Sequence, residues 1–303
     1  MKILCVIDAP EWAFHKNCLA LRKYGKNDYN IRFGMNDKYR NAFTELNKFD
    51  LILYWTDVRP DYIVKYKLPK SKTVVMIRSD IRKTCKLSRY KYWQETNLLK
   101  DHIKCFMVAN HELLKFMRKK FPMKKSFYAP GGVDLDKFYP SNNPKVWPKT
   151  PRVGWSGSKN NFSAELRGVK LISSACKQLG WEFRPAYREK RWRTQSEMIN
   201  YYHNEIDLYC DLWIGAGRQN GLLEAGACGI PLVACDKGIA RELTAGGLQV
   251  ALRDVNSVKA ALQRAWRNKE ELSKQIASRV YAEWGWKLHV ERWEEIFNQI
   301  KRM

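Results

Sequence analysis

The 303-residue chain has no uninterrupted apolar run of about eighteen residues, the length that crosses a bilayer as a helix. We therefore expect no transmembrane helix. The first apolar run is short and Asp8 follows it at once, which favours a strand and turn over a signal peptide. The eight cysteines form no C-x-x-C pair and the five histidines no H-E-x-x-H motif. We expect reduced, buried thiols in a cytoplasmic protein, without disulfides or a metal site.

Acidic residues are scarce, because 31 Asp and Glu stand against 55 Lys and Arg, for a net charge of +24. Net charge bears on partners rather than on fold, and this excess indicates a polyanion: nucleic acid, an anionic membrane surface or an acidic glycan. A generally basic proteome would produce the same bias. Residues 65–125 hold eighteen of the cations and only four acids, so most of the excess lies in a fifth of the chain.

Short apolar runs alternate with helix-like segments through the N-terminal half. This alternation predicts an α/β fold with a parallel sheet and right-handed crossovers. A segment with three prolines follows, at 141–151, and we interpret it as a linker. A second alternating unit begins at residue 152. The expected strands of the first unit are 2–8, 29–33, 49–54, 73–77, 103–108 and 126–129.

The stretch 207–235 carries the strongest pattern. A mixed apolar run at 207–213 is followed by a Gly-rich loop, a helix that opens near Leu222 with Glu224 in its first turn, and a second apolar run at 230–235. This order predicts one parallel βαβ step. Ligands of open α/β sheets bind outside the strand carboxyl ends, so the loop is a candidate cradle for a phosphorylated ligand. The alternative is that the glycines serve packing only.

One segment, at 220–243, resembles the donor-sugar motif of retaining glycosyltransferases of the GT-B superfamily, the group 1 or family 4-like branch. Its sequence is NGLLEAGACGIPLVACDKGIAREL. The resemblance implies two Rossmann-like domains facing a central cleft, with a C-terminal helix that crosses back to the first domain. The expected divisions are an acceptor domain at 1–140, the linker at 141–151, a nucleotide-sugar domain at 152–283, and the returning helix at 284–303.

The resemblance also implies a donor site. Glu224 matches the Glu that holds the ribose of the nucleotide sugar, whereas Ala216 replaces the Glu that contacts the donor sugar. Arg167 stands at the Lys of the diphosphate-binding pattern, and Ser158 stands at its Arg. Lys159, one place on, can supply the missing cation. The expected donor-binding residues are Gly157, Lys159, Arg167, Arg218, Asn220, Gly221, Leu222 and Glu224.

Acceptor-side residues are expected in the first domain. The family often carries His-Asp after the fourth strand; here Asp80 keeps the acid and the His is absent. Asp8 and Asp80 are candidate bases toward the acceptor, and a turn-forming or capping role is the alternative for both. The candidate catalytic residues are Asp8, Asp80 and Arg78, and the candidate acceptor-binding residues are Trp12, Arg82, Lys83, Lys86 and Arg89.

These features predict a glycosyltransferase with a UDP- or GDP-linked sugar as donor, retention at the anomeric carbon, and no essential metal. The favoured acceptor is DNA with hydroxymethylated bases, as for phage-type DNA glycosyltransferases. The first alternative is a membrane-surface enzyme that builds an envelope glycan or glycolipid, peripheral at the inner membrane face. The second is a catalytically degenerate polyanion-binding module, because Ala216 and the absent His both depart from the family pattern.

Overall fold

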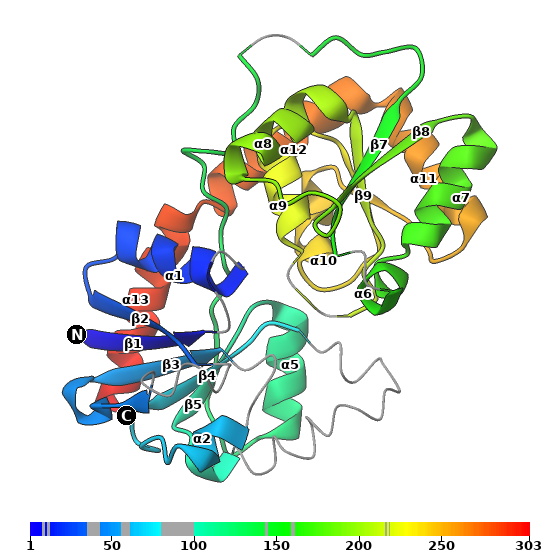
Figure 1. The fold of residues 1–303 in the computed structure, drawn as a ribbon. Helices are drawn as coiled ribbons and strands as arrows, with labels where there is room; N and C mark the ends of the chain where they lie inside the picture. The colour runs from blue at the N-terminus through cyan, green and yellow to red at the C-terminus, as the bar shows by residue number, and fades with distance from the viewer. Residues whose placement is uncertain are drawn as a thin grey trace. The chain divides into compact units, whose positions relative to one another are not determined.

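The structure is a computed structural model, and it describes residues 1–7, 10, 13–34, 43–55, 61–79, 100–142, 145–158, 161–215, 217 and 219–303. The chain forms two compact units. The first comprises Met1–Gly132, Gly215–Arg218 and Trp286–Met303, and the second comprises Val133–Ile214 and Gln219–Gly285. Both units are built on parallel sheets with helices packed against them (Figure 1), so the expected α/β architecture with two Rossmann-like domains is confirmed.

The first unit has a six-stranded sheet of order β2-β1-β3-β4-β5-β6. Its central strands β3 and β4 are buried at every position and apolar except at Thr73, as expected of a parallel sheet covered on both faces. Asn110 caps α5 by accepting a hydrogen bond from the Leu113 amide at 2.8 Å. The elements are β1 Lys2–Ile7, α1 Ala13–Tyr24, β2 Asp28–Phe33, a 3-10 turn Leu46–Lys48, β3 Leu51–Trp55, α2 Asp61–Lys65, β4 Thr73–Ile77, β5 Cys105–Val108, α5 His111–Lys120, β6 Ser126–Tyr128 and α13 Trp286–Arg302.

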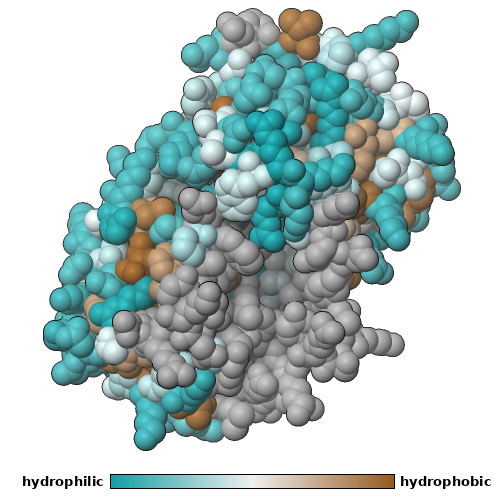
Figure 2. Space-filling model, in the orientation of Figure 1, coloured by the Kyte–Doolittle hydropathy of each residue, from teal (hydrophilic) through white to brown (hydrophobic). Residues whose placement is uncertain are grey.

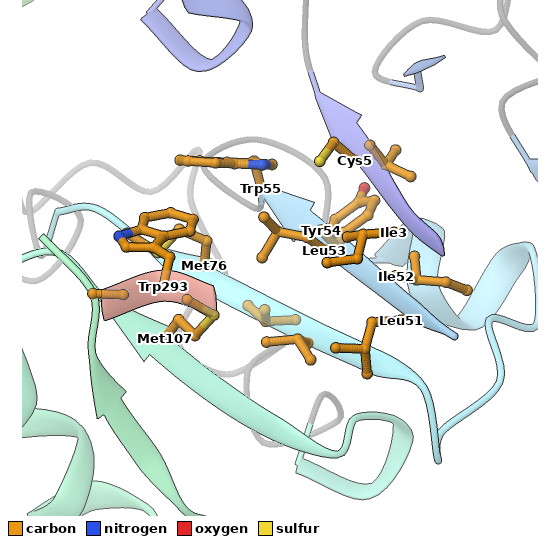
Figure 3. Close-up of a cluster of buried hydrophobic side chains, with 14 of the residues drawn as sticks. Ile3, Cys5, Leu51, Ile52, Leu53, Tyr54, Trp55, Met76, Met107 and Trp293 are labelled. Carbon is orange, nitrogen blue, oxygen red and sulfur yellow. The ribbon is translucent and has the colours of Figure 1, made fainter. Parts of the chain in front are cut away.

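Helix α13 belongs to the first unit although it ends the chain, which confirms the expected return of the C-terminal helix. Trp293 of α13 stacks on Trp55 of β3, with ring centroids 5.7 Å apart (Figure 3). Its indole nitrogen donates to the Pro130 carbonyl at 2.7 Å. Glu294 Oε1 accepts from the backbone amide of Asn27 at 3.0 Å and from the Tyr29 hydroxyl at 3.2 Å. The helix is therefore part of the core of the first unit.

The second unit has a five-stranded sheet of order β11-β10-β9-β7-β8. Each strand pair in it is parallel. The elements are β7 Arg152–Gly157, α6 Asn161–Leu166, α7 Val169–Leu179, β8 Glu182–Tyr187, α8 Gln195–Asn200, a π-helix Tyr201–Glu205, β9 Leu208–Asp211, α9 Asn220–Ala227, β10 Leu232–Ala234, α10 Ile239–Leu243, a 3-10 turn Thr244–Gly246, β11 Gln249–Val250, α11 Val255–Arg267 and α12 Lys269–Glu283.

Two further properties concern the surface and the thiols. No helix among the described residues is long and apolar enough to cross a membrane. The described residues on the face in Figure 2 are mostly hydrophilic, and the hydrophobic ones lie in small groups. Seven cysteines of the described part are buried free thiols.

Candidate functional site

The strand order of the second sheet identifies one edge as the candidate site. From β7 the chain moves to β8 on one side and then to β9 on the other, so the connections diverge between β7 and β9. Open α/β sheets bind ligands outside the carboxyl ends of the strands at such a switch point. Gly157 ends β7 and Asp211 ends β9. The expected donor-binding residues Gly157, Arg167 and Asn220–Glu224 all lie on segments that leave this edge.

Gly221 permits α9 to begin close against the end of β7. A Cβ atom at this position would overlap the Tyr209 hydroxyl and would lie 2.9 Å from Ser156 Oγ. Real Cβ atoms do not approach other heavy atoms so closely, so a side chain here would displace either the helix or the strands. Gly221 is therefore required by packing, and that packing brings the first turn of α9 to the switch point.

Glu224 lies in α9 and is partly exposed. The Tyr202 hydroxyl donates a hydrogen bond of 3.0 Å to Glu224 Oε2. Tyr202 is fully buried, and burial, followed by the charge of Glu224, raises its pKa well above the ordinary value. Its phenol therefore stays protonated and remains a donor. The result is a carboxylate of fixed orientation. Glu224 is the fifth residue of α9, so the expected place in the first turn is wrong, because the helix begins at Asn220 rather than near Leu222.

A buried layer of phenols supports this carboxylate. The ring of Tyr209 packs edge-on against Tyr202, with centroids 6.1 Å apart. The Tyr209 hydroxyl lies 2.9 Å from Ser156 Oγ and accepts from the Ser156 amide at 3.3 Å. Ser156 is the next-to-last residue of β7, so the layer joins the strand end to α9.

Arg167 is held from two sides. Its guanidinium forms an ion pair with Asp211 and lies 4.7 Å above the ring of Trp213. Asp211 is completely buried, and burial raises the pKa of its carboxyl while the charge of Arg167 opposes that rise. A buried carboxylate needs such a partner, because an unpaired buried charge is strongly unfavourable. Arg167 is thus a positioned cation at the sheet edge.

Arg253 fixes the loop that carries Arg167. Its guanidinium donates to the carbonyls of Leu166 and Glu165, each at 2.8 Å, and to the carbonyl of Leu212. These acceptors lie at the end of α6 and just beyond β9. Arg253 therefore ties together the two segments that bring Arg167 and Asp211 into contact.

The side chains of Leu222, an expected donor-site residue, and of its neighbour Gln219 are buried. The Leu222 side chain is buried in the hydrophobic core of the second unit, and its amide donates to the Gln219 carbonyl at 3.2 Å. Gln219, just before α9, is 1% exposed, and neither of its side-chain polar atoms has a hydrogen-bond partner among the described residues. Buried polar groups without partners are rare in native proteins and are found at functional sites. Asn220 is partly exposed at the first position of the helix.

In the first unit, Arg78 follows β4 directly. It is 6% exposed, and its guanidinium lies 4.8 Å above the ring of Phe14. The next residue, Ser79, forms an antiparallel bridge with Gly217. The remaining predicted site residues lie outside the described residues; they are Asp8, Trp12, Asp80, Arg82, Lys83, Lys86, Arg89, Lys159 and Arg218. Across the part of the chain that is described, no group of three or more His, Cys, Asp or Glu is placed to hold a metal ion.

Sequence reasoning missed four residues that build the site: Ser156, Tyr202, Asp211 and Arg253. Asp211 had a signal, because it is a carboxylate at the end of an apolar strand, where ligand sites form. Tyr202 had a weaker signal, as one of two adjacent tyrosines in the polar segment 194–204. That segment becomes π-helical at Tyr201–Glu205, and this local widening is common at functional sites.

Comparison with known proteins establishes the fold. No protein-family model and no curated protein matches the sequence. Sucrose-phosphate synthase from Thermosynechococcus elongatus is similar in structure, with 14% identity, a TM-score of 0.69 and 99% of each chain covered. HepE of Anabaena, in complex with UDP and glucose, has 11% identity and a TM-score of 0.70 over 99% of this chain and 100% of that chain.

A third similar structure is a mutant of TarM from S. aureus in complex with Fondaparinux, alpha-GlcNAc-glycerol and UDP. It has 15% identity and a TM-score of 0.56, and the match covers 84% of this chain and 58% of that chain. At such identities the likeness concerns the fold alone. The expected GT-B fold is confirmed by the near-complete coverage of the first two structures.

Proposed function

We propose that this chain is a glycosyltransferase that moves a sugar from a UDP-sugar to an acceptor hydroxyl. The observation that carries the proposal is a pair of positioned charges at the β7–β9 switch point. Glu224 is oriented by Tyr202, and Arg167 is oriented by Asp211 and Trp213. A nucleoside diphosphate has the matching groups, since ribose hydroxyls donate to a carboxylate and diphosphate oxygens accept from a guanidinium.

UDP is the favoured nucleotide. HepE has been solved with UDP-glucose, and the pneumococcal O-GlcNAc transferase GtfA with UDP and GlcNAc. Both share the fold of this chain, with TM-scores of 0.70 and 0.57. GDP is the alternative nucleotide. We expect no essential metal, because Arg167, together with Lys159 and Arg218, can neutralise the leaving diphosphate.

The donor would lie along the start of α9. Glu224 would accept hydrogen bonds from the ribose hydroxyls, and Arg167 would bind the diphosphate. Gly157 and Gly221 would contribute through their backbone, since the space that a Cβ atom would take is filled by Trp155 at Gly157 and by Tyr209 at Gly221. Asn220 would contact the sugar, and the buried Leu222 would contribute through the helix it anchors rather than through its side chain.

Transfer would proceed with retention. The bond between the anomeric carbon and the diphosphate oxygen breaks, and a bond from the same carbon to the acceptor oxygen forms on the same face. The acceptor proton passes to the leaving phosphate oxygen, so the products are UDP and the glycoside. Asp8 and Asp80 are the candidate groups for orienting the acceptor hydroxyl, and Arg78 is a candidate for stabilising the developing negative charge.

Charge restricts the acceptor. The excess of cations favours an anionic acceptor, either DNA with hydroxymethylated bases or a glycan or glycolipid at a membrane surface. Transfer from the bound UDP-sugar to hydroxymethylated DNA or to a lipid extract in vesicles would decide between them. DNA binding without any sugar transfer to hydroxymethylated DNA would exclude DNA as the acceptor.

The donor site is tested by thermal unfolding in the presence of UDP, GDP, ADP and CMP sugars. A ligand that binds only the native state stabilises it by about 2.7 kcal/mol at a concentration of 100 times its Kd. We expect a UDP-sugar to raise the midpoint of the parent and to leave that of Glu224→Ala unchanged. Glu270→Ala, an exposed carboxylate on α12, is the matched control and should respond like the parent. No shift with any donor would favour the polyanion-binding module, for which Ala216 is the sequence argument.

A further inference from the structure

Several described cations of the basic stretch lie at the amino-terminal edge of the first sheet. Lys104 directly precedes β5 and Lys125 directly precedes β6. Parallel strands begin at a common edge, and two backbone hydrogen bonds document the alignment here. The Lys104 amide donates to the Thr73 carbonyl at 2.8 Å, and the Phe106 amide donates to the Lys125 carbonyl at 3.0 Å. Lys70 lies in the turn that leads into β4.

Helix α5 brings further cations to the same edge. It begins after β5 and runs back along the sheet, so its last turn, with Arg118 and Lys119, lies near the starts of the strands. The Lys124 ammonium donates to the Ile103 carbonyl at 2.7 Å, just before β5. Burial, and then the charge of Lys70, lowers the pKa of Lys124, which places these two cations near each other. We call Lys70, Lys104, Arg118, Lys119, Lys124 and Lys125 the strand-start surface.

A methionine protrudes from the middle of this surface. Met123 is 93% exposed, between the last turn of α5 and Lys124. It lies in a tight turn closed by a 3.0 Å hydrogen bond from the Lys124 amide to the Phe121 carbonyl. Phe121 is buried and packs against Phe106, with ring centroids 5.2 Å apart. The turn is thus anchored in the core and presents an apolar side chain to solvent on a rigid base.

The strand-start surface is separate from the edge at which ligands bind. The carboxyl ends of the same strands lie at the opposite edge of the sheet, where Arg78 follows β4. A polyanion bound at the strand starts would therefore leave the ligand edge accessible. Such a surface fits attachment of the protein to a large anionic partner rather than a catalytic role.

We propose that the strand-start surface attaches the protein to an anionic lipid bilayer, with Met123 at the boundary between the head groups and the acyl chains. Lysine and arginine clusters bind anionic head groups, and an apolar side chain beside them inserts at the acyl boundary. A nucleic-acid backbone satisfies the cations but offers no apolar environment to Met123. No exposed aromatic residue lies among the described residues of this surface to stack on bases. The proposal goes beyond the proposed sugar transfer and does not depend on it.

The test measures binding of the full chain to vesicles of phosphatidylcholine, alone or mixed with phosphatidylglycerol, by co-sedimentation. We expect binding to the mixed vesicles only, weakening as salt rises. Replacing three exposed cations, Arg118→Gln, Lys119→Gln and Lys125→Gln, should lower the partition coefficient about 100-fold, since each cation near the surface contributes about 1 kcal/mol. Met123→Ser should lower it several-fold without a change in charge.

The matched control removes the same charge elsewhere, with Lys170→Gln, Lys177→Gln and Arg267→Gln on exposed positions of α7 and α11. It should bind vesicles nearly as well as the parent. Thermal midpoints and UDP-sugar shifts of all variants should match the parent, so that a loss of binding is not a loss of fold. Equal loss in both triple variants would overturn the proposal. So would binding to duplex DNA, but not to vesicles, that depends on the strand-start cations and is unaffected by Met123→Ser.

Discussion

Tyr202 donates a 3.0 Å hydrogen bond to Glu224 across 22 residues of sequence, from a π-helix to the first turns of α9. This hydrogen bond orients the Glu224 carboxylate, which we propose accepts hydrogen bonds from the ribose hydroxyls of the donor. The Tyr202 phenol stays protonated and remains a donor, because Tyr202 is fully buried and its pKa is raised. Any loss of this hydroxyl should therefore act on donor binding through Glu224.

Tyr202→Phe should weaken UDP binding about tenfold. The substitution keeps the ring packed against Tyr209 and removes only the hydroxyl, and a hydrogen bond to a charged group contributes about 1.5–3 kcal/mol. Titration calorimetry with UDP measures the change. Tyr281→Phe removes a hydroxyl from a ring that is 41% exposed and should leave the affinity unchanged. Equal affinity in Tyr202→Phe and the parent would show that the contact supports packing alone.

Arg167→Lys should lower UDP affinity by roughly 10- to 100-fold although the charge is kept. Lysine lacks the planar guanidinium that pairs with Asp211 through one nitrogen and lies above the ring of Trp213. The control is Arg184→Lys, since Arg184 pairs with Glu182 at 2.6 Å at a partly exposed position. Should Arg167→Lys bind UDP as the parent does, the Arg167–Asp211 pair would be structural and the diphosphate would need another cation.

Gly221→Ala should destabilise the second unit by about 1–3 kcal/mol or more, because the new methyl group would overlap the Tyr209 hydroxyl. Adding Tyr209→Phe should recover part of this loss by removing that oxygen. Gly226→Ala lies in the same helix, where the nearest side-chain atoms are 3.1 Å away. It should be close to neutral, because Ala favours helices over Gly by about 1 kcal/mol. Urea unfolding measures the free energy of unfolding of the parent, Gly221→Ala, Gly221→Ala with Tyr209→Phe, and Gly226→Ala. An equal loss in the two single alanine variants would contradict the packing argument.

Lys145 should make stability depend on alkaline pH. Burial lowers its pKa in the folded protein from 10.5 to about 8, although the charge of Asp207 opposes the shift. Between these two values the unfolded state binds more protons, so the contribution of Lys145 to the free energy of unfolding rises with pH. The slope is about 1.4 kcal/mol per pH unit, and below pH 8 the contribution is constant.

Lys145→Met provides the comparison, because it keeps an apolar stem and cannot titrate. The difference in unfolding free energy between the parent and the variant should rise in favour of the parent from about pH 8 upward. Other groups that titrate in this range contribute equally to both proteins and cancel. Parallel pH curves for the two proteins would mean that Lys145 has an ordinary pKa in the fold.

Local pattern was enough for several elements. The strand 73–77 has the bounds expected from sequence, and the expected strands 29–33 and 126–129 differ from the observed ones by one residue at one end, because each is a short apolar run. The helix that carries Glu224 could also be predicted, but its start could not, because Asn220 and Gly221, expected in a turn, form its first two residues. Charge pattern located the cations within the sequence, but it did not show that six of them lie at the strand starts.

The partners of the site residues were decided by tertiary structure alone. Arg167 and Asp211 are 44 residues apart, and they meet because β9 lies next to β7 in the sheet. Neither helix propensity nor apolar periodicity predicts that strand order. The same holds for Trp293, which reaches Trp55 only because the last helix packs on the first sheet. The sequence by itself determined which segments are strands and helices and which of them end in charged or Gly-rich loops, since those preferences act within a few residues. The order of the strands determined which loops meet, because burial of apolar faces is satisfied between segments that are distant in the chain.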